Sequence, residues 1–163
     1  MGHTIEANFE DILPGEDDFD ELHLARVIQF AETNELLPIP VRELNGKYLH
    51  LDGRHSLMYH YLAEKEPLKL FLLDEQSDGM HNHNFPGIET RLLMERNKNI
   101  RGRWYSAEYI FQRLNVQNYI EHFENLKQKY SFLKDLKTCK EYLANKKIYR
   151  GDFITDHLDA LLN

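Results

Sequence analysis

Two strand-like runs joined by Asn45-Gly46 set the strongest limit on how this chain folds. Residues 39–44 precede the pair and residues 47–51 follow it. Asn and Gly both tolerate positive φ, and a two-residue turn of this kind suits the twist of antiparallel strands. We therefore predict an antiparallel hairpin in this part of the chain.

The flanking segments extend the hairpin to a β-α-β-β-α-β order within the first 74 residues. Residues 3–9 have the composition of a short strand, and the Pro-Gly pair at 14–15 breaks the extended run. Apolar residues recur at helical spacing between Asp20 and Ala31, with acidic residues in the first turn, where the helix dipole favours them. Residues 55–65 predict a second helix, and residues 68–73 predict a largely buried strand.

The C-terminal part predicts helices in three or four pieces from Ser106 onward. Residues 75–104 contain Gly and Pro without a sustained period, so we expect a long loop there. Asp152 is a candidate cap of a last helix. Two apolar stripes follow helical spacing, one through Val116, Tyr119, Ile120, Phe123, Leu126 and Tyr130, and one through Phe132, Leu136, Cys139 and Leu143.

These elements predict an α+β protein. We expect residues 1–104 to form a small mixed sheet with helices and a long loop, and residues 105–163 to form a helical subdomain packed on it. A β-α-β-β-α-β unit of this size buries a modest fraction of its surface and is marginal alone. We therefore expect the two parts to fold as one cooperative domain.

Charge is unevenly distributed along the chain. Residues 1–94 contain 7 basic and 18 acidic residues, whereas residues 95–150 contain 13 basic and 6 acidic residues. The basic segment leaves two interpretations open: the solvated face of amphipathic helices, or a surface that binds nucleic acid or another protein. No apolar run is long enough for a membrane span and no signal-peptide pattern opens the sequence, so we expect a soluble, cytoplasmic protein.

The segment Asp52-Gly53-Arg54-His55-Ser56 lies where a strand is predicted to end and a helix to begin. A helix start presents backbone N–H groups and a positive dipole end to an anion, and Gly53 allows close approach of a ligand. Arg54 is a candidate to neutralise a phosphate, His55 to donate a hydrogen bond or a proton, and Asp52 to hold Mg²⁺ or accept a proton. The alternative is purely structural, because Asp-Gly is a common turn and Asp52 or Ser56 is a suitable helix cap.

The motifs around this segment resemble the ParB/sulfiredoxin superfamily, over roughly residues 4–74. The resemblance rests on the order Ile12-Leu13-Pro14, a helix, Leu37-Pro38-Ile39-Pro40-Val41, Asn45-Gly46-Lys47-Tyr48 and Leu51-Asp52-Gly53-Arg54-His55-Ser56-Leu57. It implies a nucleotide-binding fold in which the loop at the helix start receives phosphates. Members of the superfamily include clamp proteins that hydrolyse CTP, ATP-dependent sulfinic acid reductases, free-serine kinases and nucleases.

Asp52 and Gly53 match the aspartate-glycine of the superfamily, and His55 matches its histidine. Ser56 stands where the superfamily has a phosphate-binding arginine. The sulfiredoxin cysteine falls at Arg54, so sulfinic acid reduction by that route is not expected. The resemblance implies ATP or CTP with Mg²⁺ at Asp52, Gly53, Arg54, His55 and Ser56.

Two functions follow from these patterns. The first is a nucleotide-binding protein that transfers or hydrolyses a phosphoryl group, with Asp52 and His55 as catalytic residues and Asp52 as the metal ligand. The second is a non-catalytic adaptor that binds nucleic acid or protein through its basic residues 95–150. Ser56, in place of the arginine, favours the adaptor.

Overall fold

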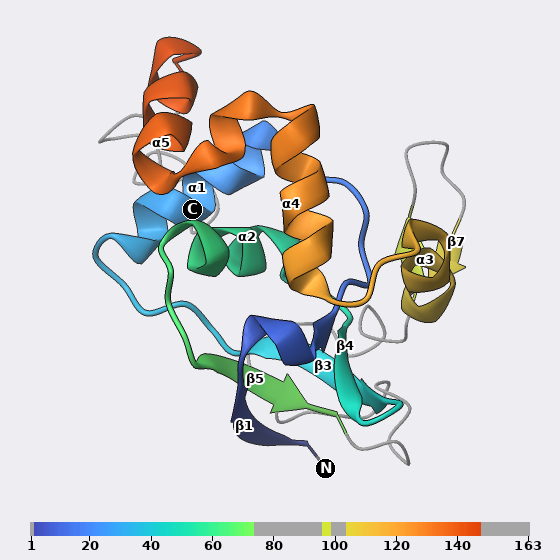
Figure 1. The fold of residues 1–163 in the computed structure, drawn as a ribbon. Coiled ribbons are helices and arrows are strands. Elements are labelled where there is room, and N and C mark those ends of the chain that lie inside the picture. The colour runs from blue at the N-terminus through green and yellow to red at the C-terminus, as the bar shows by residue number, and fades with distance from the viewer. Residues whose placement is uncertain (1, 74–95, 99–103, 148–163) are drawn as a thin grey trace.

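The hairpin around Asn45-Gly46 is present and forms the centre of a five-stranded sheet (Figure 1). The computed structural model describes residues 2–73, 96–98 and 104–147. Strand β3 (Ile39–Leu44) pairs antiparallel with β4 (Lys47–His50), and the turn residues have φ of 53° and 78°, as a type I′ turn requires. The hairpin prediction is confirmed. It succeeds because the two turn residues determine the geometry of the turn locally.

The sheet is mixed, in the order β1-β5-β3-β4-β2. Strand β1 (His3–Ala7) pairs antiparallel with β5 (Leu68–Leu72), β5 pairs parallel with β3, and β4 pairs parallel with the short β2 (Ile12–Leu13). Helices accompany this sheet, so the α+β class is confirmed.

Four helices gather on one side of the sheet (Figure 1). They are α1 (Glu21–Ala31), α2 (Arg54–Leu62), α4 (Tyr119–Lys129) and α5 (Leu136–Asn145). One apolar core joins them to the sheet, and it includes Leu24, Ile28, Val41, Leu57, Leu70, Tyr119, Phe123, Phe132, Cys139 and Leu143. Residues from both halves of the chain therefore share one core.

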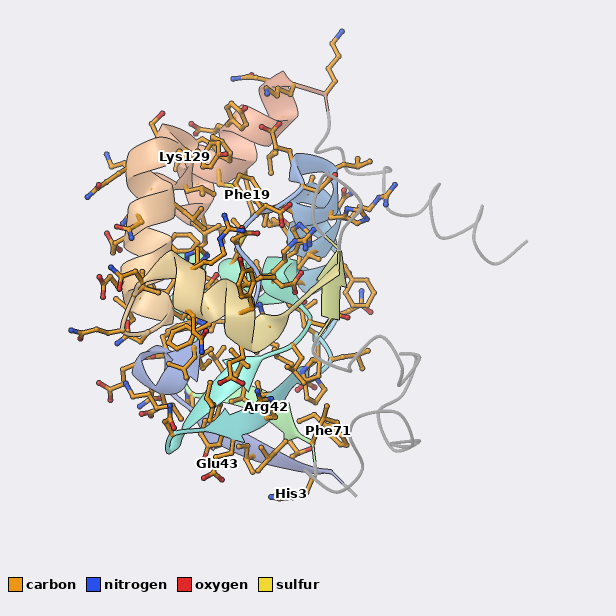
Figure 2. The ribbon with its side chains drawn as sticks, turned by 90° about the vertical axis from the view of Figure 1, so that its right-hand side faces the viewer. His3, Phe19, Arg42, Glu43, Phe71 and Lys129 are labelled. Atoms are coloured by element: carbon orange, nitrogen blue, oxygen red, sulfur yellow. The ribbon has the colours of Figure 1, made fainter. Side chains whose placement is uncertain are left out.

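The other face of the sheet is also covered. Leu49, Leu51 and Phe71 pack there with Ala107, the first residue of α3 (Ala107–Leu114). Arg42 on β3 donates to Glu108 on α3 at 2.8 Å (Figure 2). The second face of the sheet is therefore covered around β4, whereas Lys69 and Glu6 at the β1–β5 edge stay exposed.

Three helix starts are capped by the side chain of the preceding residue, which explains where those helices begin. Asp20 accepts from the His23 N–H at the start of α1, Asn118 from Glu121 at α4, and Asp135 from Thr138 at α5. The helix predicted from Asp20 is therefore confirmed with its cap.

Several local predictions need correction. The strand predicted over residues 3–9 ends at Ala7, because a 3₁₀ turn, η1 (Phe9–Asp11), follows and leads into β2. The second helix begins at Arg54 and ends at Leu62, earlier than the predicted 55–65. Ile120, placed on the apolar stripe, is 36% exposed, whereas its neighbours Tyr119 and Phe123 are buried.

The predicted long loop 75–104 contains two short paired strands where the structure describes it. These are β6 (Arg96–Lys98) and β7 (Trp104–Ser106), which pair antiparallel. A 3₁₀ segment, η4 (Ser131–Lys134), separates α4 from α5. The rest of the loop and the helix predicted after Asp152 lie outside the described residues. Among the described helices, none has the length and apolar character needed to cross a membrane.

Candidate functional site

The start of α2 is formed by a tight turn after β4. Gly53 is the N-cap residue, with φ of 85°, a left-handed conformation that glycine adopts without strain. Asp52 turns back and accepts from the Gly53 N–H through Oδ1 at 2.7 Å. Among the described residues, no side-chain cap hydrogen bond forms at the start of α2, so its first N–H groups are not occupied by a capping side chain. Of the structural alternative, the Asp-Gly turn is present, whereas neither Asp52 nor Ser56 forms a side-chain cap of α2 among the described residues.

A cleft of about 310 Å³ opens at this helix start. Its lining includes every residue that the sequence singled out: Asp52, Gly53, Arg54, His55 and Ser56. Glu16, His23 and Val27 complete the lining. The tertiary structure thus adds side chains from α1 and from the loop before it.

Glu16 is the main residue that sequence reasoning missed. It follows Pro14-Gly15 in an acidic stretch that looked like an ordinary turn, but its side chain is only 5% exposed. The Arg54 guanidinium pairs with Glu16 Oε2 and lies 3.5 Å from Asp18 Oδ1. Arg54 was expected to neutralise a phosphate, yet its charge is already balanced by these two carboxylates. The signal in the sequence was an acidic residue directly after the Pro-Gly pair, and its burial could not be read from the sequence.

The two buried carboxyl groups of the cleft have opposite pKa shifts. Burial and the nearby charge of Glu16 raise the pKa of Asp52, despite the hydrogen bond from Gly53. Burial also raises the pKa of Glu16, but its interactions with His50 and Arg54 outweigh burial, so that pKa is lowered. Glu16 is therefore the permanent negative charge, and Asp52 is the carboxyl that takes up a proton more readily.

His55 is held by the backbone of the opposite wall. The Asp20 N–H donates to His55 Nε2 at 2.9 Å, so the ring proton of the neutral imidazole sits on Nδ1. Burial, together with the charges of Arg54 and His23, lowers the pKa of His55 to about 4. At neutral pH the His55 ring is therefore neutral, and its Nδ1–H is a hydrogen-bond donor rather than a source of protons.

His50 is buried behind the cleft. It alternates with Leu49 and Leu51 along the chain, which favours a position on the opposite side of the strand from these leucines, and it is only 1% exposed. Leu49 and Leu51 pack against α3 on one face, and His50 lies on the opposite face, under the helices. Both faces of the sheet are covered at β4, so alternation along this strand does not separate buried from exposed residues.

A magnesium ion fits this cleft only as part of a larger complex. Among the described residues, no group of three His, Cys, Asp or Glu side chains is arranged to hold a metal. Mg²⁺ commonly binds through one or two carboxylates together with the phosphates of a nucleotide. Asp52 fits that role, because only its Oδ1 is engaged, by Gly53.

The basic half of the chain is partly neutralised within the molecule. Lys140 pairs with Glu32 at 2.7 Å and Lys146 with Glu21 at 3.1 Å, both between α5 and α1. Lys129 lies on the exposed side of α4 (Figure 2). The positive charge of residues 95–150 therefore serves in part to join the two halves.

Comparison with known proteins adds no relative: no protein-family model and no curated protein matches the chain. Functional inference therefore depends on the geometry of the cleft. The resemblance of residues 4–74 to the ParB/sulfiredoxin superfamily remains an expectation from short motifs.

Proposed function

We propose that the cleft at the start of α2 binds a nucleoside triphosphate, ATP or CTP, as its Mg²⁺ complex and that the protein transfers or hydrolyses a phosphoryl group there. The uncapped helix start beside Asp52 is the observation that carries this proposal. The resemblance to the ParB/sulfiredoxin superfamily supports the choice of a nucleotide over another anion.

Phosphate binding would use the backbone more than side-chain charge. The N–H groups of Arg54, His55 and Ser56 occupy the first turn of α2, where the helix dipole favours an anion. The Ser56 hydroxyl and His55 Nδ1 would supply further hydrogen bonds, although Ser56 provides no positive charge. Gly53 lines the cleft beside this turn.

The charge of the cleft makes binding dependent on a cation. Glu16 and Asp18 already balance Arg54, and Asp52 adds a third carboxyl group. A free polyphosphate would be repelled by the unbalanced acidic charge, whereas Mg²⁺ held between Asp52 and the phosphates would offset it. Asp52 is then the metal ligand or base, and the metal would polarise the transferred phosphoryl group.

A thermal-shift experiment tests this function. We expect ATP, CTP or pyrophosphate at millimolar concentration to raise Tm only when Mg²⁺ is present, because ligand binding to the folded state stabilises it. Asp52→Asn retains an acceptor for the Gly53 N–H and should abolish the Mg²⁺-dependent shift. Glu43→Gln, an exposed carboxylate on β3, is the matched control and should leave the shift unchanged. Absence of any shift in the wild-type protein with Mg²⁺ would refute the proposed function.

The adaptor function is the second candidate, favoured by the engagement of Arg54 with Glu16 and by Ser56 in the arginine position. In this function the cleft is inactive and residues 95–150 bind nucleic acid or protein. Binding to oligonucleotides at low ionic strength, weakening steeply with added salt, would support it. The ion pairs of Lys140 and Lys146 with α1 count against a free basic surface.

A further inference from the structure

Three buried polar atoms lie behind the cleft without a hydrogen-bond partner among the described residues. They are Glu16 Oε1, His50 Nε2 and the Tyr119 hydroxyl. The three residues are 6%, 1% and 2% exposed, and they come from the loop before α1, from β4 and from α4. A buried polar atom without a partner is costly, so the position of these three atoms needs an explanation.

The three residues are neighbours behind the cleft. Glu16 Oε1 lies 3.6 Å from His50 Nε2, which is too long for a direct hydrogen bond. The His50 and Tyr119 rings are edge-on, with centroids 6.5 Å apart. Burial raises the pKa of Tyr119, and electrostatic interactions with Tyr61 and Glu16 raise it further.

The backbone determines which atoms can donate. The Gly15 N–H donates to His50 Nδ1 at 2.8 Å, so Nδ1 carries no proton. The neutral ring therefore carries its proton on Nε2, toward Glu16. The region then contains one donor from His50, one carboxylate acceptor from Glu16 and one hydroxyl that serves as either. A water molecule satisfies this combination, since buried waters typically make about three hydrogen bonds to such groups.

We propose that one internal water molecule accepts from His50 Nε2–H, donates to Glu16 Oε1 and bonds to the Tyr119 hydroxyl, so that His50 and Tyr119 position the Glu16 carboxylate against Arg54. The water site is inferred from these three atoms and does not depend on the proposed function. Its consequence for ligand binding rests on the proposed function of the cleft. Through Tyr119, helix α4 would determine the orientation of a side chain that lines the cleft.

Removing the hydroxyl distinguishes a bridged group from an unpaired one. If water bridges it, Tyr119→Phe in the full chain lowers Tm by about 2 to 4 °C, the shift that the loss of roughly one buried hydrogen bond produces in a domain of this size. If the hydroxyl is unpaired, the same variant leaves Tm unchanged or raises it, and the proposal is overturned. Tyr61→Phe is the matched control, because its hydroxyl bonds only the exposed Glu124 at 2.8 Å.

The position of the proton on the His50 ring provides a second test, which does not depend on the stability of the protein. We expect nitrogen NMR of the imidazole at neutral pH to show an unprotonated Nδ1 and a protonated Nε2 whose signal shifts in Tyr119→Phe and not in Tyr61→Phe. A proton on Nδ1, or a signal indifferent to Tyr119, would overturn the proposal. His50→Asn keeps an acceptor near the Gly15 N–H but offers nothing to Glu16, and it should lower Tm as Tyr119→Phe does.

These measurements need no nucleotide. If they give the expected results and Mg²⁺-nucleotide still causes no thermal shift, the water site stands and the proposed function fails. If nucleotide binds, Tyr119→Phe should reduce the Mg²⁺-dependent shift while Tyr61→Phe preserves it.

Discussion

At the scale of single residues, Gly15 shows how closely the loop before α1 approaches β4. A Cβ atom at this position would lie 2.0 Å from the His50 carbonyl oxygen and 2.8 Å from the Ala107 Cβ. The first of these neighbours is backbone and cannot move aside alone. In the sequence, Pro14-Gly15 only marked the end of an extended run. In the structure, the glycine is needed for the close packing of the loop against β4.

We therefore predict that Gly15→Ala lowers the free energy of unfolding by about 3 kcal/mol or more, at the upper end of overpacking costs. Gly46→Ala is the comparison, because Gly46 has positive φ but has open space around it. It should cost only about 1 kcal/mol through backbone strain. Equal losses for the two variants in urea denaturation would contradict the close approach.

A second prediction at the residue scale concerns acid. Burial is the main cause that lowers the pKa of both His55 and His122 from 6.5 to about 4. The unfolded chain binds protons at higher pH than the folded protein, so the stability from these neutral rings is complete above pH 6.5 and is lost as pH falls from 6.5 to 4. Each ring contributes up to about 3 kcal/mol to this pH-dependent part of the free energy of unfolding.

Urea unfolding between pH 7 and pH 4 checks this slope. His122→Gln, which cannot titrate, should flatten the pH dependence, even if it lowers stability at pH 7. A variant whose stability falls with pH as steeply as that of the wild type would show that His122 does not contribute to it.

At the scale of elements, the start of α2 depends on a left-handed residue. Gly53 has φ of 85°, and a Cβ there would meet only Ile39 side-chain atoms at 3.6 and 3.7 Å, which is ordinary contact. The cost of substitution is therefore conformational. We predict a loss of about 1–2 kcal/mol for Gly53→Ala and a smaller loss for Gly53→Asn, because asparagine tolerates this conformation better. Thermal unfolding of both variants tests which loss is larger. A larger loss for Gly53→Asn than for Gly53→Ala would show that contacts of the new side chain, not the positive φ, determine the cost.

At the scale of the whole molecule, the helices after Ala107 complete the core of the N-terminal sheet. Phe123 and Leu133 are fully buried, and they share a cluster with Leu24 and Leu57. Figure 1 shows α4 and α5 lying over α1 and α2. A chain that ends near Leu73 would expose this surface to water.

We predict that the full chain unfolds in one calorimetric transition and that residues 1–74 alone do not fold. Phe123→Ala should lower the free energy of unfolding by about 3–5 kcal/mol and shift that single transition as a whole. Two transitions, or a well-dispersed NMR spectrum from residues 1–74, would show that the halves fold independently.

The sequence alone determined the features that depend on near neighbours. The turn at Asn45-Gly46, the helix that follows Asp20 and the junction of a strand and a helix at Asp52-Gly53 follow from local backbone preferences and helical spacing. These signals act over a few residues, so they can be read without knowing the rest of the fold.

Only the tertiary structure decided how the cleft is charged. Arg54 meets Glu16, and His50 meets the Gly15 N–H, across 35 or more residues of chain. His50 is buried because helices cover its face of the sheet, while α3 covers the other face at β4. The alternation of residues within β4 does not indicate that both faces are covered there. The partners of a buried charge are set by which distant segments pack together, and for this reason the sequence located the site but not its electrostatics.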